Sequence, residues 1–172
     1  EMCIRDREKH ELVYLDSVFD AAARAQTDAE LQEIRLELSQ SGYLKKGRNS
    51  STDKTLKPLQ PIKLKSKDGF DIWVGRNNLQ NDKLTLKTAK GDDLWLHTKD
   101  IPGAHVIVFA GGREIPESTI EEAAHIAASN SKAKGQTKIP VDYTKVRYVK
   151  KPNGAKPGMV IFSNNKTLLV DG

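Results

Sequence analysis

The sequence predicts an α+β protein: a mainly antiparallel sheet with two helices, preceded by an N-terminal helical hairpin or coiled-coil base. Two observations support this class. The first part of the chain repeats apolar residues at helical spacing, and the later part consists of short alternating runs separated by turn-forming residues. They divide the chain into a helical arm at 1–44, a basic linker at 45–61 and a body at 62–172.

The arm is expected to hold two helices. Their apolar stripes are formed by Leu12, Leu15, Phe19 and Ala22 and by Leu31, Ile34 and Leu38. Between the stripes, Thr27 and Glu30 have the spacing of a capping box, and Gly42 follows where a left-handed helix end is favoured. The arm is either a hairpin that packs on its own domain or the base of a longer coiled coil. The start at Glu1 leads us to expect a piece of a longer protein.

The body alternates strands with two helices. A helix is expected from Asn77 to about Ala89, and a clearer one from Pro116 to about Lys132, with acidic residues near its start and lysines near its end. Asp68-Gly69 predicts a hairpin turn, and Pro102-Gly103 suits the centre of a type II turn. Strands are expected near 62–65, 70–74, 93–98, 104–109, 138–143, 145–149, 158–163 and 166–170.

Charge is divided unequally along the chain. The formal net charge is +5, but the arm carries five basic and ten acidic residues, so that it holds −5 and residues 45–172 hold +10. A basic body predicts a polyanionic partner. The single cysteine, Cys3, excludes an internal disulfide and a cysteine-based zinc site, so we expect a cytoplasmic protein. No apolar run is long enough to predict membrane insertion.

The first candidate site surrounds a predicted strand and turn. It consists of Trp95, His97, Lys99, Asp100 and His105. Three interpretations compete: a metal site of two histidines and an aspartate, acid–base catalysis by a His–Asp pair, and a structural or RNA-recognition role. We favour the third, because neither a fourth metal ligand nor a nucleophile accompanies the group. No catalytic residue, metal or cofactor is therefore expected.

Two further clusters are candidates for contact with phosphate. Arg76, Asn77, Asn78 and Asn81 lie at a strand-to-helix junction, where free N–H groups form an anion site and asparagines also serve as ordinary helix caps. Near the end of the chain, basic residues surround Tyr148, an aromatic available for stacking. These basic residues are Arg147, Lys150, Lys151 and Lys156. Edge strands also carry lysine simply to prevent aggregation.

Several long motifs in order resemble the NFACT-R domain of the NFACT family. They are FDIWVGRNNLQND at 70–82, DLWLH at 93–97, DIPGAHVI at 100–107, VDYT at 141–144 and KPNGAKPG at 151–158. The resemblance covers roughly residues 56–172, and the arm, ending in SGYL at 41–44, is similar to the end of the family's coiled-coil and middle region.

The resemblance implies an RNA-binding, non-enzymatic module of a ribosome-associated quality-control factor. Full-length family members bind the obstructed large ribosomal subunit and tRNA, and support C-terminal alanine tailing of stalled nascent chains. The implied partners are the large subunit, its rRNA and tRNA. Gram-positive members are also labelled fibronectin-binding proteins, which gives an alternative: a surface-displayed adhesin fragment that binds fibronectin. The first hypothesis predicts steeply salt-dependent RNA binding, and the second predicts binding that survives physiological salt.

Overall fold

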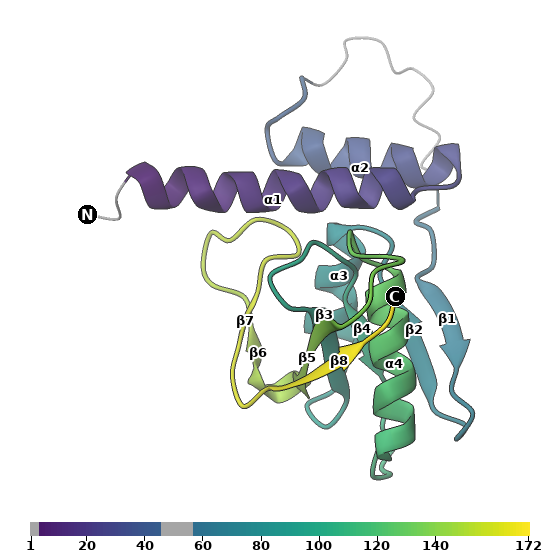
Figure 1. Cartoon of the computed structure of the whole chain (residues 1–172). Coiled ribbons are helices and arrows are strands. Elements are labelled where there is room, and N and C mark those ends of the chain that lie inside the picture. Colours follow the sequence, from purple (N-terminus) through teal and green to yellow (C-terminus); the bar gives the residue numbers. More distant parts are fainter. Residues whose placement is uncertain (1–3, 46–56) are drawn as a thin grey trace.

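The computed structural model describes residues 4–45 and 57–172 (Figure 1). A helical hairpin lies across one end of an α+β body, as the sequence predicts. Its helices are α1 (Ile4–Arg24) and α2 (Asp28–Gln40), and the first half of α1 projects past the body. Cys3 and most of the predicted basic linker, at 46–56, lie outside the described residues. Each described helix is too short or too polar to cross a membrane.

Only part of the α1 stripe predicted from the sequence is buried, since Leu15 and Ala22 pack against the arm's core. Leu12 and Phe19 are 66% and 70% exposed, whereas the arm's small core is formed by Tyr14, Val18 and Ala21 of α1 with Ile34 of α2. Both stripes have helical spacing, so periodicity alone does not separate them. The buried stripe can include Tyr14 because the tyrosine hydroxyl donates a hydrogen bond to the buried carboxylate of Glu37 at 2.8 Å.

Local signals at the ends of α2 are confirmed. The Thr27 hydroxyl accepts from the Glu30 amide at 3.3 Å, and the Glu30 carboxylate accepts from the Thr27 amide at 3.1 Å, which completes the capping box. Gly42 has φ +84°, the left-handed conformation expected just after the helix.

The body is built on a six-stranded antiparallel sheet with the order β1-β2-β4-β3-β5-β8. The strands are β1 (Ile62–Lys65), β2 (Asp71–Val74), β3 (Leu94–Thr98), β4 (Val106–Val108), β5 (Ile139–Lys145) and β8 (Lys166–Val170). The β3–β4 turn differs from the predicted type II turn, because the positive φ, +54°, falls on Asp100 rather than on Gly103. Gly103 instead allows close approach: a Cβ there would lie 2.9 Å from Ser131 Cβ.

Both faces of the sheet are covered. Helix α4 (Glu117–Ser129) packs an alanine-rich face on the strand residues that point one way, such as Leu96 and Val106. On the other face, Trp95 and Ile107 pack against Leu84 of a helical segment that lies where the sequence predicts it but changes geometry along its length. This segment consists of α3 (Asn78–Lys83) followed by a π-helical turn (Leu84–Thr88).

A separate two-stranded ribbon lies on the same side as α3. A 3₁₀ turn (Val146–Tyr148) leads into β6 (Val149–Lys150), the chain then runs up to the arm, and β7 (Ile161–Phe162) returns to pair with β6. Val149 is buried beside Trp95, which fixes the ribbon against the body.

Candidate nucleic-acid interface

The arm docks on the strand-to-helix junction that the sequence marked as an anion site. The Arg76 guanidinium donates to Glu30 of α2 at 2.5 Å and to the Gln60 carbonyl at 2.9 Å. The Arg76 amide is also bound, donating to the Gln80 side chain at 2.9 Å. Arg76 therefore holds the arm, and its predicted contact with RNA stays a prediction.

The asparagines of this junction also make internal contacts. Asn77 caps α3 by accepting from the Gln80 amide at 2.9 Å, and its own amide donates to Glu33 of α2 at 2.7 Å. Asn78, buried, donates to Ser17 at 2.9 Å and to Glu37 at 3.1 Å. Asn81, also buried, accepts from the His105 amide at 3.1 Å. The helix-capping interpretation is thus correct for Asn77, and Asn78 joins the body to both arm helices.

Three glutamates on one side of α2 meet this junction, and their environments differ. Glu37 is buried, and burial raises its pKa, although the Tyr14 hydroxyl and the Asn78 amide partly stabilise the carboxylate. Glu30 has a lowered pKa: partial burial opposes ionisation, but hydrogen bonds from the Gln26 amide, Arg76 and the Thr27 amide outweigh it. We name this set the arm-docking network; its members are Glu30, Glu33, Glu37, Arg76, Asn77 and Asn78.

His105 is buried with both ring nitrogens bonded inside the body. Nε2 lies 3.1 Å from the Gly158 carbonyl, which only accepts, so Nε2 carries the proton. Nδ1 then accepts from the Thr85 hydroxyl at 2.8 Å. Burial lowers the pKa of His105 well below its ordinary value, so the ring stays neutral and ties the 151–158 loop to the sheet.

Trp95 and His97 lie side by side on the sheet face that carries the ribbon. Their rings stack at 5.8 Å with a 6° interplanar angle, and His105 meets both edge-on. Trp95 is fully buried, and His97 is half-buried with a pKa lowered chiefly by that burial.

The two histidines are thus neighbours, as the sequence suggested, but Asp100 is not part of their group. Lys99 and Asp100 are exposed in the β3–β4 turn, and none of the contacts recorded for the described residues joins Asp100 to either histidine. Across residues 4–45 and 57–172, no three His, Cys, Asp or Glu side chains are arranged to hold a metal ion.

Much of the predicted basic segment is also held by internal contacts. Lys151 donates to Asp82 at 2.8 Å, and Asp82 also accepts from the Gly158 amide at 2.9 Å. Lys156 lies 5.0 Å from the ring centre of Tyr43, so it contacts the arm. Arg147 donates to Asp92 and to the Gly91 carbonyl. Lys150 is exposed, and none of the ion pairs recorded for the described residues includes it.

The ribbon adds exposed apolar residues that were not among the predicted site residues. Ile161 is 58% exposed, and Tyr148 and Phe162 are each 36% exposed, next to Lys150 and Arg147. Tyr148 was recognised from the sequence as a stacking residue. Phe162 lay inside an expected strand, and only its pairing with β6 brings it to the basic segment.

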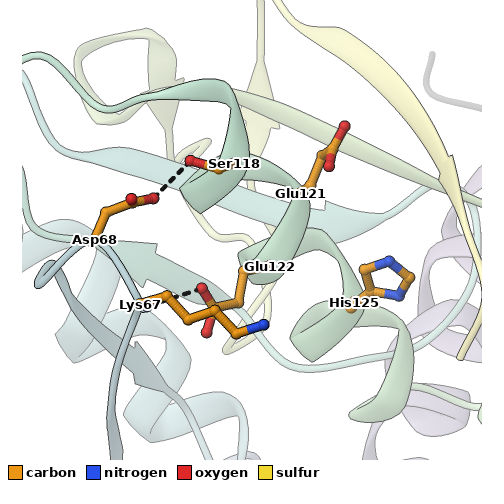
Figure 2. Close-up of a pocket in the computed structure, with 6 residues that line it drawn as sticks. All are labelled: Lys67, Asp68, Ser118, Glu121, Glu122 and His125. Carbon is orange, nitrogen blue, oxygen red and sulfur yellow. Dashed lines mark hydrogen bonds between the residues drawn. The ribbon is translucent and has the colours of Figure 1, made fainter.

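An open hollow lies on the opposite side of the sheet, between the β1–β2 turn and α4 (Figure 2). Asp68 accepts from Ser118 at 2.6 Å there, and the Lys67 amide donates to Glu122 at 3.1 Å. Its lining contains Asp68, Glu121 and Glu122 against a single lysine, Lys67. A hollow of this sign repels phosphate, so the exposed basic residues of the ribbon side form a better candidate nucleic-acid interface than this hollow.

The chain is similar to several known proteins. The chain is 45% identical over 164 residues to the Rqc2 homolog RqcH of Bacillus subtilis and 41% identical over 163 residues to that of Streptococcus suis. Each alignment covers 94% of this chain, but only 28% and 29% of the respective relative, so the chain spans under a third of their length.

A solved structure shares the fold. It is the C-terminal part of the fibronectin/fibrinogen-binding protein from Streptococcus suis, with a TM-score of 0.87, 40% identity, and coverage of 96% of this chain and 66% of that one. Residues 61–164 match the family described as the NFACT protein RNA binding domain. The chain therefore belongs to the NFACT family, and its body is an NFACT-R domain.

Proposed function

We propose that the chain is the RNA-binding module of a ribosome-associated quality-control factor. In the full-length protein it would help to bind the obstructed large ribosomal subunit and tRNA, and so support C-terminal alanine tailing of stalled nascent chains. The observation that carries the proposal is the match of the body to an RNA-binding domain family, together with its +10 charge from residue 45 onward.

The geometry supports a contact on the ribbon side of the body. Lys145, Arg147 and Lys150 are exposed there, whereas the hollow behind the sheet is acidic. Lys99 is also exposed, but the pairing of β3 with β5 places it at the opposite end of these strands from Lys145, so its contact with RNA is a separate part of the proposal. We further propose that the module performs no catalysis and acts in the cytoplasm. Support for a binding role is that both ring nitrogens of His105 bond within the body, whereas a general base presents a free nitrogen to its substrate.

The test is binding of fluorescent tRNA and of purified large subunits to the whole chain across a salt series. We expect Lys145→Ala/Lys150→Ala to weaken binding and to lower the slope of log K against log salt by about one for each lost phosphate contact. Lys65→Ala/Lys67→Ala removes the same charge from the β1–β2 hairpin and is the matched control. Absence of binding by the wild type at low salt, or equal effects of the two double variants, would overturn the proposal.

A second candidate function follows from the solved relative, which is named a fibronectin/fibrinogen-binding protein. Under this alternative the chain is an adhesin fragment that acts at the cell surface. Immobilised fibronectin separates the two candidates: capture that persists at physiological salt, in a protein that binds no RNA at low salt, would favour the adhesin.

Arg76 is unsuitable as a first probe of RNA contact. Arg76→Ala removes the ion pair to Glu30 and the bond to the Gln60 carbonyl, so it disturbs the arm whether or not RNA touches this residue. A loss of binding in that variant becomes informative only when the arm is shown to remain docked.

A further inference from the structure

The β6–β7 ribbon exposes an apolar surface in the most basic part of the candidate interface. Lys150 and Ile161 are paired directly across the two strands, so their side chains share one face of the ribbon. Phe162 pairs with buried Val149 and so lies on the other face of the ribbon, where it remains 36% exposed, and Tyr148, also 36% exposed, precedes the ribbon in the chain. Exposed apolar side chains gathered within a few residues indicate a binding surface rather than a chance exposure.

The ribbon is held rigidly although it is short. The Phe162 ring lies 4.7 Å from the ring of buried Trp95, and the Ser163 amide donates to the Tyr148 carbonyl at 3.2 Å. The Thr144 hydroxyl of β5 donates to the Ser163 carbonyl at 2.8 Å. A surface that is already ordered loses little conformational entropy when a ligand binds.

The chemistry of this surface suits unpaired bases. Base–aromatic stacking needs a free base face, which a duplex hides, and neighbouring cations then bind the phosphates between stacked bases. The carboxylate of Asp92, which lies beside Arg147, is already paired with Lys145 and Arg147, so its charge is largely compensated.

We propose that the β6–β7 ribbon binds single-stranded RNA, with Tyr148 and Phe162 stacking on unpaired bases and Lys150 contacting the adjoining phosphate. This inference rests on the proposed RNA-binding function and specifies the kind of RNA and the residues that read it. The ribbon would select unpaired segments irrespective of sequence, because every base offers a face for stacking.

The test compares a single-stranded RNA 12-mer with the same sequence in a duplex, by fluorescence anisotropy with the whole chain. We expect Tyr148→Ala and Phe162→Leu each to weaken single-strand binding by about fivefold or more, the equivalent of roughly 1 kcal/mol per stacked base. Duplex binding and the salt slope should stay unchanged, because stacking releases no counterions. Leucine at 162 keeps an apolar contact with Trp95 while removing the aromatic face.

The conservative variants Tyr148→Phe and Phe162→Tyr should bind like the wild type, and so should Leu169→Ala, which removes a 66% exposed side chain from the edge strand β8. Far-UV circular dichroism checks that each variant is folded. If Phe162→Leu does not fold, the test depends on Tyr148→Ala alone. The stacking site would be overturned, but RNA binding would not, by either of two results. One is an unchanged affinity of Tyr148→Ala for the single strand, and the other is an equal loss of affinity for the single strand and the duplex. Wild-type protein that binds neither RNA would overturn the proposed function itself.

Discussion

At the scale of single residues, Gly158 has little freedom to change. Its φ is +78°, and a Cβ would lie 2.7 Å from Cγ of Asn78, a side chain already fixed by Ser17 and Glu37. We predict that Gly158→Ala lowers the free energy of unfolding by more than the roughly 1–2 kcal/mol expected from left-handed backbone strain alone. Urea denaturation monitored by fluorescence measures the loss.

Gly154 provides the matched control for this substitution. It lies in the same loop with φ +75°, but a Cβ there would meet nothing within 4 Å. Gly154→Ala should therefore lower the free energy of unfolding only by the backbone strain, without the steric contact that Gly158→Ala makes with Asn78. Equal losses in the two variants would mean that the contact with Asn78 relaxes freely, contrary to the expectation.

His105 makes stability depend on pH. Its pKa is lowered well below 6.5 by burial first, and then by the nearby His97 and Lys151 charges, so the unfolded chain takes up a proton below about pH 6.5 that the folded chain does not. The stability that His105 contributes is present above that pH and is lost as the pH falls. We predict a fall of up to about 1.4 kcal/mol per pH unit from this residue.

The measurement is the free energy of unfolding at pH 7.5, 6.5 and 5.5 for the wild type and for His105→Gln. The variant should be less stable at pH 7.5 but should lose less on acidification. Glu37 acts in the opposite direction, since its raised pKa stabilises the fold toward acid, but it is common to both proteins and cancels in the difference. Parallel pH profiles would show that His105 does not titrate between the two states.

At the scale of elements, α2 is attached to the body through its carboxylates. Glu30 and Arg76 are only 12% and 31% exposed at the side chain, so their ion pair is partly shielded from solvent. We predict a coupling energy of about 0.5–3 kcal/mol between Glu30→Gln and Arg76→Gln in a double-mutant cycle. Hydrogen exchange should accelerate in α1 and α2 of either single variant while the sheet stays protected.

Arg76→Lys serves as the control for geometry at this contact. Lysine keeps the charge but loses the second donor that reaches the Gln60 carbonyl, so it should restore only part of the protection. Full protection in the Arg76→Gln variant would show that packing around Tyr14 and Val18 docks the arm without the ion pair.

The elements also show what the sequence could and could not predict. The capping box at Thr27, helix α4 and the approximate positions of most strands depend on neighbours along the chain, so local patterns reveal them. The strand expected at 145–149 is mostly a 3₁₀ turn instead. Which face of α1 is buried depends on the residues that pack against it, and two apolar stripes of α1 have the same helical period, so periodicity does not choose between them. The ribbon's exposed Phe162 depends on pairing with β6, which no local pattern contains.

The same limit explains the Arg76 cluster. An arginine and asparagines at a helix start have the chemistry of an anion site, and the anions that meet them in this structure are the glutamates of α2. Sequence alone could not choose between a phosphate and a carboxylate more than 40 residues away, since both accept the same hydrogen bonds.

At the scale of the whole molecule, the arm and the body share charge as well as contacts. The arm is acidic and the body is basic. Glu30, Glu33 and Glu37 face the junction and accept hydrogen bonds from its side chains, so this part of the arm's negative charge binds the body instead of repelling RNA. The ribbon is separated from the acidic hollow by the sheet, which leaves the two faces of the body with different signs. Under the proposed function, this polarity would turn the ribbon side toward RNA.

Because the arm-docking network is buried between arm and body, we predict that both unfold in one transition. Most of the helix signal at 222 nm comes from α1 and α2, with 21 and 13 residues, whereas both tryptophans, Trp73 and Trp95, lie in the body. Urea curves from circular dichroism and tryptophan fluorescence should coincide for the wild type.

The double variant Arg76→Gln/Asn78→Ala removes hydrogen-bond donors to Glu30 and Glu37. In this variant the transition seen by circular dichroism should move to a lower urea concentration than the transition seen by fluorescence. Coincident curves in that variant would mean that the apolar contacts of the arm suffice for coupling, and separate curves in the wild type would show that the network does not unite the two parts.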